Sequence, residues 1–179
     1  MKSLLCAGVA ACALTAAASA DVTFEFENFE AAGNFFPPIF AAGELVGTLT
    51  GVGINAELVA DAAGGAWAND LTILVGAADY STLNLQAGGF SNYGADERLG
   101  WINGGSGFAG TTVIDEQALA TPLDISDLTV FLGNGWGTET SFGEWSGSIT
   151  LIGVDLVPAP GALALLGVAG LAGSRRRRA

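Results

Sequence analysis

The chain has 179 residues and a formal net charge of −12 at pH 7, and all 18 acidic residues lie between residues 21 and 157. Arg98 is the only base in that part, which therefore carries a net charge of −17 and cannot bind nucleic acid, because phosphate contacts need lysine or arginine. The same part has no His, Lys or Cys, which excludes Ser-His-Asp triads, cysteine proteases, imidazole-bound zinc and Schiff-base lysines.

The first 20 residues have the pattern of a secretory signal peptide. Lys2 supplies a basic start, an uncharged apolar run extends from Leu4 to Ala18, and Ala18-Ser19-Ala20 forms a small-x-small cleavage site before Asp21. An alternative is a lipobox-like Val9-Ala10-Ala11-Cys12, which would lead to acylation of Cys12. Both cysteines lie in this segment, so the exported chain is expected to have no disulfides.

Residues 21–157 form the predicted domain, which is long enough for one hydrophobic core. Period-two alternation over residues 21–27 puts Val22, Phe24 and Phe26 on one face of an opening strand. The 22 glycines in this part suit many tight turns. We therefore expect an all-β fold, an antiparallel β-sandwich or jelly roll. Further strands are predicted at 45–50, 71–75, 81–85, 111–114, 128–132 and 146–157, and brief helical stretches at 56–63 and 116–120.

Two of the predicted strands repeat a short motif. Asp70-Leu-Thr-Ile-Leu-Val-Gly76 matches Asp127-Leu-Thr-Val-Phe-Leu-Gly133 at four identical positions. Either the two strands obey the same general pattern, or they are equivalent strands of two half-motifs.

Carboxylates are the main candidates for chemistry in the predicted domain. A glycan hydrolase would need two acids that flank the scissile bond, and the candidate pairs are Asp96/Glu97, Asp115/Glu116 and Glu139/Glu144. Calcium is an alternative use, because it takes carboxylate, carbonyl and amide oxygens from loops. Asp96, Glu97, Asp124 and Asp127 are the calcium candidates. A solvated acidic surface explains the same residues without any site, and we expect no catalytic residues.

Four tryptophans lie in the predicted domain, at positions 67, 101, 136 and 145. Trp145 opens the last predicted strand and is expected to pack in the core. Trp136 lies among small residues in Gly133-Asn-Gly-Trp-Gly137, where its ring would be exposed on a loop and could stack on a sugar face. Trp136 is therefore the candidate glycan contact, with a loop tryptophan folded onto the core as the alternative.

The C-terminal tail, residues 158–179, differs from the acidic domain in composition. The proline motif Val157-Pro158-Ala159-Pro160 is followed by an apolar stretch from Gly161 to Gly173 and by the basic cluster Arg175, Arg176, Arg177 and Arg178. The 18 residues from 157 to 174 would make a helix of about 27 Å, short but workable for a bilayer core of about 30 Å. The arginines predict a cytoplasmic end for this transmembrane helix.

This tail, paired with the N-terminal signal peptide, resembles the PEP-CTERM sorting signal of Gram-negative bacteria. Pro158-Ala159-Pro160 replaces the usual Pro-Glu-Pro, so the glutamate of the motif is missing here. The resemblance implies processing by an exosortase-type enzyme, with an inner-membrane-anchored form before processing and a cell-surface or matrix form afterwards. It says nothing direct about residues 21–157, because such tails are attached to unrelated domains.

Together these features predict three regions: a signal peptide (1–20), an acidic glycine-rich β-domain (21–157) and a sorting tail (158–179). We expect an exported, non-enzymatic surface or extracellular-matrix protein that meets extracellular polysaccharide. The alternatives are a glycan-binding or calcium-stabilised adhesive module, and a carboxylate-dependent glycan hydrolase. No cofactor other than calcium is expected.

Overall fold

The structure is a computed structural model that describes residues 20–158. This part is all-β: it has two sheets and one short 3-10 helix, and no α-helix occurs within it. The elements are β1 (Val22–Ala32), β2 (Pro38–Phe40), β3 (Leu45–Leu58), η1 (Ala68–Asp70), β4 (Leu71–Gly76), β5 (Leu83–Ala87), β6 (Glu97–Leu99), β7 (Thr112–Asp124), β8 (Thr129–Asn134) and β9 (Phe142–Leu156).

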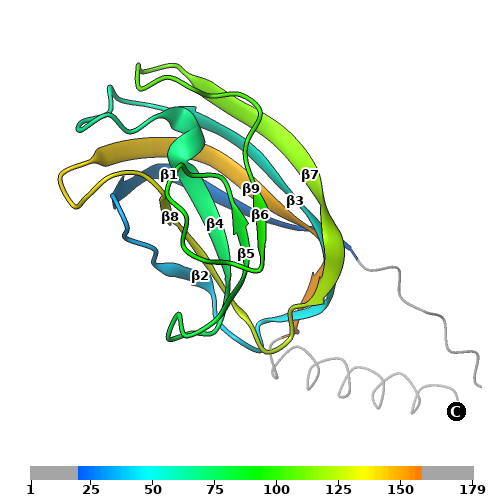
Figure 1. The fold of residues 1–179 in the computed structure, drawn as a ribbon. Coiled ribbons are helices and arrows are strands. Elements are labelled where there is room, and N and C mark those ends of the chain that lie inside the picture. Colours follow the sequence, from blue (N-terminus) through cyan, green and yellow to red (C-terminus); the bar gives the residue numbers. More distant parts are fainter. Residues whose placement is uncertain (1–19, 159–179) are drawn as a thin grey trace, which may run out of the picture.

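The strands form a four-stranded sheet in the order β1-β9-β3-β7 and a five-stranded sheet in the order β2-β8-β4-β5-β6 (Figure 1). All neighbours are antiparallel except β5 and β6. The pairing is nested: β1 pairs with β9, β2 with β8, β3 with β7 and β4 with β5. Elements distant in sequence, such as η1 and the β8–β9 connection, are thereby brought to one end of the domain.

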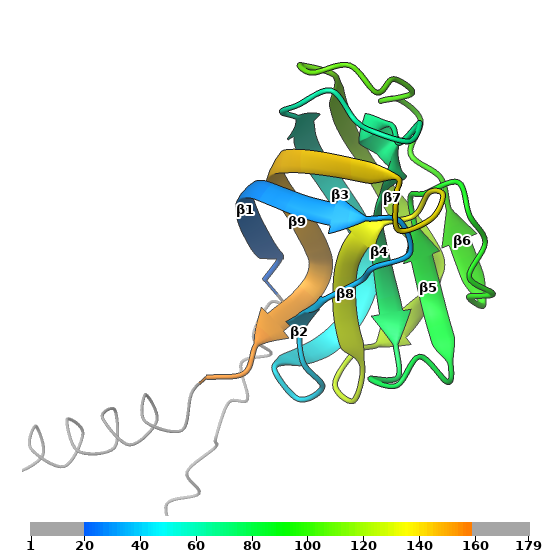
Figure 2. The same cartoon turned by 90° about the vertical axis from the view of Figure 1, so that its left-hand side faces the viewer.

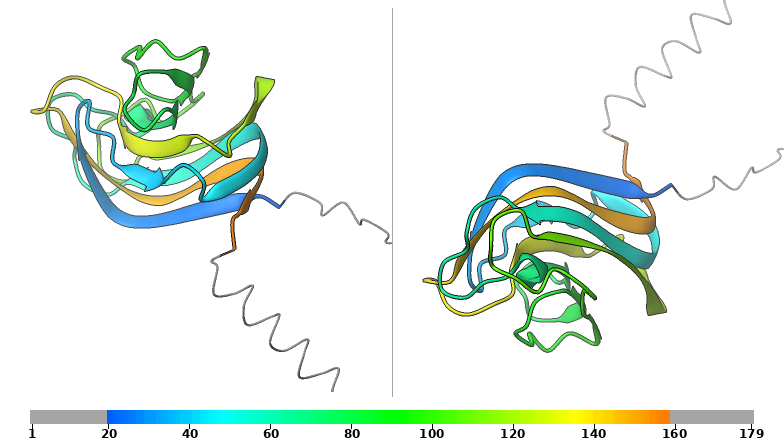
Figure 3. Two further views of the ribbon diagram at one scale, coloured as in Figure 1. Left: turned by 90° about the horizontal axis from the view of Figure 1, so that it is seen from below. Right: turned by 90° about the horizontal axis from the view of Figure 1, so that it is seen from above.

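The two sheets are curved and face each other, as the end-on views in Figure 3 show. Their inward side chains form one shared hydrophobic core. The four-stranded sheet contributes its inward residues by period-two alternation, for example Val52 and Ile54 of β3 and Ile149 and Leu151 of β9. Trp145 is fully buried among them, which confirms the prediction for this residue, and its indole N–H donates to the carbonyl of Ala68 at 3.1 Å. The first residue of η1, Ala68, is thus part of the core together with the two sheets.

Strands β4 and β8 are buried along their whole length because both of their faces are covered. Their inward side chains join the shared core, while Leu74 and Phe131 face outward and pack with Phe36 in a second, smaller cluster. This explains the unbroken apolar runs of the repeated motif. The two copies lie side by side as antiparallel partners, with Leu74 opposite Phe131.

The two predicted helical stretches are wrong. Residues 56–58 end β3, and 116–120 lie in the middle of β7. Burial alternates in both: Ala56 and Leu58 are buried around exposed Glu57, and Leu119 faces the core between exposed neighbours. The helix preference of Ala, Glu and Leu is a weak effect, and pairing of β3 with both β7 and β9 overrides it here.

Each predicted strand lies at least in part on an observed one, and the observed strands on the four-stranded sheet are longer. β1 continues from the predicted end at 27 to Ala32, through a register shift near Asn28, which has a φ of 51°. The three-residue strands β2 and β6 were not predicted. Both lie at the edges of the five-stranded sheet. They form because β2 pairs with β8 and β6 pairs with β5, and not because of a hydrophobic pattern in their own sequence.

The two chain ends of the described part leave the domain side by side. The backbone N–H of Ala20 donates to Asp155 Oδ1 at 3.1 Å, and that of Gly153 donates to Asp21 Oδ1 at 3.1 Å. Figure 2 shows this end of the domain opposite the end that carries η1. Between residues 20 and 158 no helix has the length and apolar character needed to cross a bilayer; the predicted signal peptide and tail helix lie outside the described residues.

Candidate ligand-binding site

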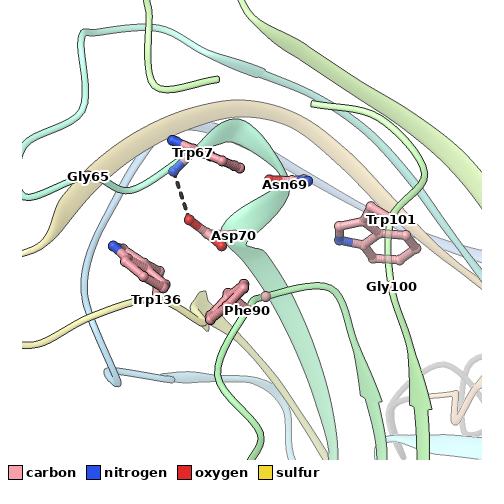
Figure 4. A pocket seen from close by; sticks show the side chains of 9 residues that line it. Gly65, Trp67, Asn69, Asp70, Phe90, Gly100, Trp101 and Trp136 are labelled. Atoms are coloured by element: carbon pink, nitrogen blue, oxygen red, sulfur yellow. Dashed lines mark hydrogen bonds between the residues drawn. The ribbon is translucent and has the colours of Figure 1, made fainter. Parts of the chain in front are cut away.

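The end of the domain opposite the chain ends carries a pocket of about 200 Å³. Four connections build it: the β3–β4 connection with η1, and the β5–β6, β6–β7 and β8–β9 connections. Figure 4 shows Asp70 with Trp67 on one side and Trp136 and Phe90 on the other. We call it the tryptophan pocket; its lining consists of Gly65, Trp67, Asn69, Asp70, Gly89, Phe90, Gly100, Trp101 and Trp136.

The single turn of η1 sets Trp67 and Asp70 relative to each other. The backbone N–H of Trp67 donates to Asp70 Oδ2 at 2.8 Å, and the backbone N–H of Asp70 donates to the Trp67 carbonyl at 3.1 Å. The turn is also tied to the β6–β7 connection, since Ala68 N–H donates to Ser106 O and Asn69 N–H to Gly104 O. These bonds hold Trp67 with 49% of its surface exposed at the mouth of the pocket.

Asp70 is the one carboxylate in the pocket lining, and only 4% of its surface is exposed. Burial raises the pKa of its carboxyl to about 6, against the opposing effect of the Trp67 and Phe90 backbone N–H groups. The group is therefore mainly ionised at pH 7 and mainly protonated at pH 5. A carboxylate held in this way can accept hydrogen bonds from a ligand or pair with a positive charge.

Aromatic rings form the walls of the pocket. Phe90 is 71% exposed and meets the half-buried Trp136 edge to face, with ring centroids 4.9 Å apart. The Trp136 indole N–H donates to Gly64 O at 3.2 Å, which fixes this ring. Trp101 is buried, and its indole N–H donates to Leu71 O at 2.8 Å. A Cβ on Gly88 would lie 2.1 Å from that nitrogen, so only glycine fits there.

The Phe90 and Trp136 loops are joined through Gly135. Its N–H donates to Asp70 O at 2.7 Å, and its carbonyl accepts the N–H groups of Phe90 and Ser91 at 3.1 and 2.9 Å. A Cβ on Gly135 would lie 2.2 Å from Thr72 Oγ1, so this close approach depends on glycine. The aromatic side chains of the pocket are therefore presented by a connected backbone.

Arg98, on β6, contributes to the site by holding the Phe90 loop. Its Nη2 donates to the carbonyls of Gly89 at 3.1 Å and Phe90 at 2.7 Å. The only base between residues 21 and 157 thus binds backbone oxygens beside the pocket.

Of the candidate site residues predicted from the sequence, Trp136 is the one that lines the pocket; Trp67 and Trp101 also line it but were assigned no role from the sequence. Trp67, Asp70 and Phe90 were missed, because they are separated in sequence and meet only through the nested strand pairing. One signal could have been used: Trp67-Ala-Asn-Asp70 places an indole and two polar side chains directly before an unbroken apolar strand.

Two of the calcium candidates, Glu97 and Asp124, accept hydrogen bonds from backbone N–H groups. Glu97 accepts from the backbone N–H of Ala120 at 2.6 Å, and Asp124 accepts from Ser126 N–H and Oγ at 3.0 and 2.8 Å. Asp96 and Glu97 line one hollow with residues 119–123, which does not include Asp124 or Asp127. Within residues 20–158 no three Asp, Glu, His or Cys side chains gather into a metal-binding group. Calcium binding stays a prediction.

The three carboxylate pairs considered for hydrolysis lie outside the tryptophan pocket. Asp115 and Glu116 are consecutive residues of β7, which point to opposite faces of a strand. Asp115 accepts from Ile102 N–H at 3.1 Å and from Gln117 Nε2 at 2.8 Å. Glu144 stands opposite Glu30 of β1, and Glu139 is exposed in the β8–β9 connection.

Two residues of the predicted sorting motif belong to the described part. The backbone N–H of Val157 donates to Glu44 O at 2.9 Å, and Pro158 is exposed. The remaining predicted residues, Ala159, Pro160 and the arginines at 175–178, lie outside it.

Comparison of the chain with family models, with curated proteins and with solved structures gave no match. The chemistry of the pocket itself is therefore the basis for interpreting the site.

Proposed function

We propose that this is an exported, non-enzymatic protein of the cell surface or extracellular matrix whose domain binds a glycan in the tryptophan pocket. The observation that carries the proposal is the set of aromatic rings, Trp67, Phe90 and Trp136, around the polar side chains of Asn69 and Asp70. Aromatic faces stack on the apolar faces of sugar rings, and a few polar groups fix orientation through the hydroxyls.

Strand topology supports this proposal. Nested pairing of β1 with β9, β2 with β8, β3 with β7 and β4 with β5 is what a long hairpin rolled into two sheets produces, and we assign the domain to the jelly-roll sandwiches on this basis. Lectin domains are among the proteins with this architecture. The architecture alone does not fix a function, so the pocket carries the argument.

A binding role agrees with the chemistry of the pocket better than hydrolysis does. Glycan hydrolysis by the usual route needs two carboxyl groups about 5–9 Å apart. Asp70 is the single carboxylate among the nine lining residues. The proposal therefore assigns Asp70 to ligand recognition.

The position of the pocket fits export and anchoring. Figure 2 shows that β1 begins and β9 ends at the opposite end of the domain from η1, and η1 contributes Asn69 and Asp70 to the tryptophan pocket. If the signal peptide directs export and the tail then anchors the chain in the inner membrane, the tryptophan pocket points away from the membrane. Release by an exosortase-type enzyme would carry the same pocket to the surface or the matrix polysaccharide.

A polysaccharide array tests the binding proposal. The full-length chain, kept in mild detergent, should bind at least one glycan, and Trp67→Ala and Trp136→Ala should each weaken that binding by tenfold or more. Phe142→Ala, which removes a partly exposed aromatic ring outside the pocket, is the matched control and should bind like the parent chain. Unchanged binding in both tryptophan variants would contradict the proposal.

A further inference from the structure

Asp70 has an unusual environment for a glycan contact. Most of its surface is buried among aromatic rings, and the Trp67 backbone N–H donates to its Oδ2. Burying a carboxylate is costly unless a positive charge or several hydrogen bonds compensate it. Amide and backbone groups alone could recognise the neutral hydroxyls of a sugar. A carboxylate at this position therefore indicates a ligand that carries a positive charge in addition to hydroxyls.

The charges around the pocket also favour a positively charged ligand. The part of the chain from 21 to 157 carries 18 acidic residues and one base, so its field attracts cations. That base, Arg98, donates to the carbonyls of Gly89 and Phe90. The pKa of Asp70 is set by burial and by backbone N–H groups. Its other titratable neighbour, Tyr93, has a hydroxyl that donates to Asn34 Oδ1 at 2.6 Å.

The rings around Asp70 add a second preference for positive charge. The faces of Trp and Phe rings carry negative electrostatic potential and attract ammonium groups, with tryptophan the strongest. Trp67, Trp136 and Phe90 surround the side of the pocket that Asp70 occupies (Figure 4). A buried carboxylate inside such a group of rings is suited to an ammonium ion.

We propose that the tryptophan pocket recognises an amino sugar with a free ammonium group, which pairs with Asp70 while the sugar ring stacks on Trp67 or Trp136. This inference rests on the proposed glycan-binding function and names its ligand class. A sugar suits the site better than a small cation, because Trp67 and Phe90 keep open ring surface at the mouth, where a longer glycan can continue. N-acetylation of the amino sugar would remove its positive charge, and Asp70 would then have no charged partner in the ligand.

Titration of the full-length chain with three short oligosaccharides tests this inference. The probes are a β-1,4-linked glucosamine hexamer, the N-acetylglucosamine hexamer and the glucose hexamer. A salt concentration of about 0.5 M screens the general attraction of cations to an acidic surface. The glucosamine hexamer should bind roughly tenfold to a hundredfold more tightly than the other two, as expected for a charge-assisted hydrogen bond.

Two variants isolate the role of Asp70. Asp70→Asn keeps the size of the side chain and an acceptor for Trp67 N–H, and should abolish the preference for the free amine. Asp127→Asn removes the same charge from an exposed residue outside the pocket and should keep it. A lysine hexamer, which has ammonium groups but no sugar rings, should bind at least tenfold more weakly than the glucosamine hexamer.

The possible results separate the two proposals. Equal binding of all three hexamers, lost in Trp67→Ala, would overturn the amino-sugar inference and leave glycan binding in place. Equal binding of the lysine hexamer, or equal effects of the two Asp→Asn variants, would also overturn the inference, because general charge attraction would then explain the result. Binding of none of the hexamers overturns it as well, while the array decides on glycan binding.

Discussion

The two sheets of the domain differ on their outer faces. Across the four-stranded sheet, Glu25, Ser148 and Asn55 stand side by side on β1, β9 and β3, with the exposed Ile114 of β7 next to them, so this face carries mainly polar and acidic side chains in solvent. On the five-stranded sheet the outward side chains of the central strands are covered, and several of them are apolar. There Leu74 and Phe131 pack with Phe36 and Tyr93. One outer face meets solvent, and the other forms a second core.

This difference explains why the site lies where it does. Outward apolar side chains need a cover, so the connections around the five-stranded sheet fold back over it. Gln86 fixes one of them: its Nε2 donates to Ser91 O at 2.7 Å, and its Oε1 accepts from Tyr93 N–H at 3.1 Å. The same connection carries Phe90 into the tryptophan pocket. Covering the second sheet and building the pocket are therefore done by the same chain segments.

The largest expected effect concerns the core that both sheets share. Trp145→Ala removes a fully buried indole and its hydrogen bond to Ala68 O, and should lower the free energy of unfolding by about 3–5 kcal/mol. Chemical denaturation of the full-length chain measures this. A loss below about 1 kcal/mol would mean that the two sheets are not held together through this residue.

The second cluster should contribute less, because it is smaller and closer to the surface. Leu74→Ala leaves a cavity under Phe36 and should cost about 2–3 kcal/mol, the lower part of the usual range for such changes. The variant should also weaken glycan binding, because the Phe90 loop belongs to the same cover. Loss of stability with unchanged binding would separate the cover from the pocket.

A smaller effect, with a defined pH dependence, is expected at Asp70. Its pKa of about 6 in the folded chain lies above the ordinary value of 3.8, so the folded state binds the proton more tightly than the unfolded state does. Ionisation then costs stability as the pH rises from about 4 to above 6. This pKa difference corresponds to at most about 3 kcal/mol, and because solvent at the open pocket screens part of the effect, Asp70→Asn should be more stable than the parent by about 2 kcal/mol at pH 7.5; at pH 4 the two should be nearly equal.

Thermal or chemical denaturation at the two pH values checks this prediction, with Asp127→Asn as the control. The exposed control removes the same charge but no buried carboxylate. If both variants gain the same stability at pH 7.5, relief of general repulsion among the acidic residues is the cause, and burial of Asp70 is not.

Sequence patterns predicted the fold where a strand has one solvent-facing side or a continuous apolar run. The alternation of Val22, Phe24 and Phe26 identified β1, and the repeated apolar motif identified β4 and β8. The edge strands β2 and β6 have three residues each and depend on their partners, so their own sequence carries almost no signal. The helical interpretation of 56–63 failed because pairing of β3 with two neighbours outweighs local preference.

The site was less predictable than the fold. Trp136 stood out because glycines surround it, which is a local property. Asp70 could not be distinguished from 17 other acidic residues, because its burial depends on Phe90 and Trp136, which lie 20 and 66 positions further along the chain. The nested strand order, and not spacing along the chain, brings these three residues together.

The smallest effect is expected on the solvent-facing side of the four-stranded sheet. Ser148→Ala replaces a partly exposed side chain between Glu25 and Asn55, and surface changes of this kind alter stability by no more than about 0.5 kcal/mol. Glycan binding should also be unchanged, because Ser148 does not line the tryptophan pocket. Denaturation and the hexamer titration check both points. A loss of binding in this variant would mean that the glycan also contacts the solvent-facing side of the four-stranded sheet. Glycan binding would then not be confined to the tryptophan pocket.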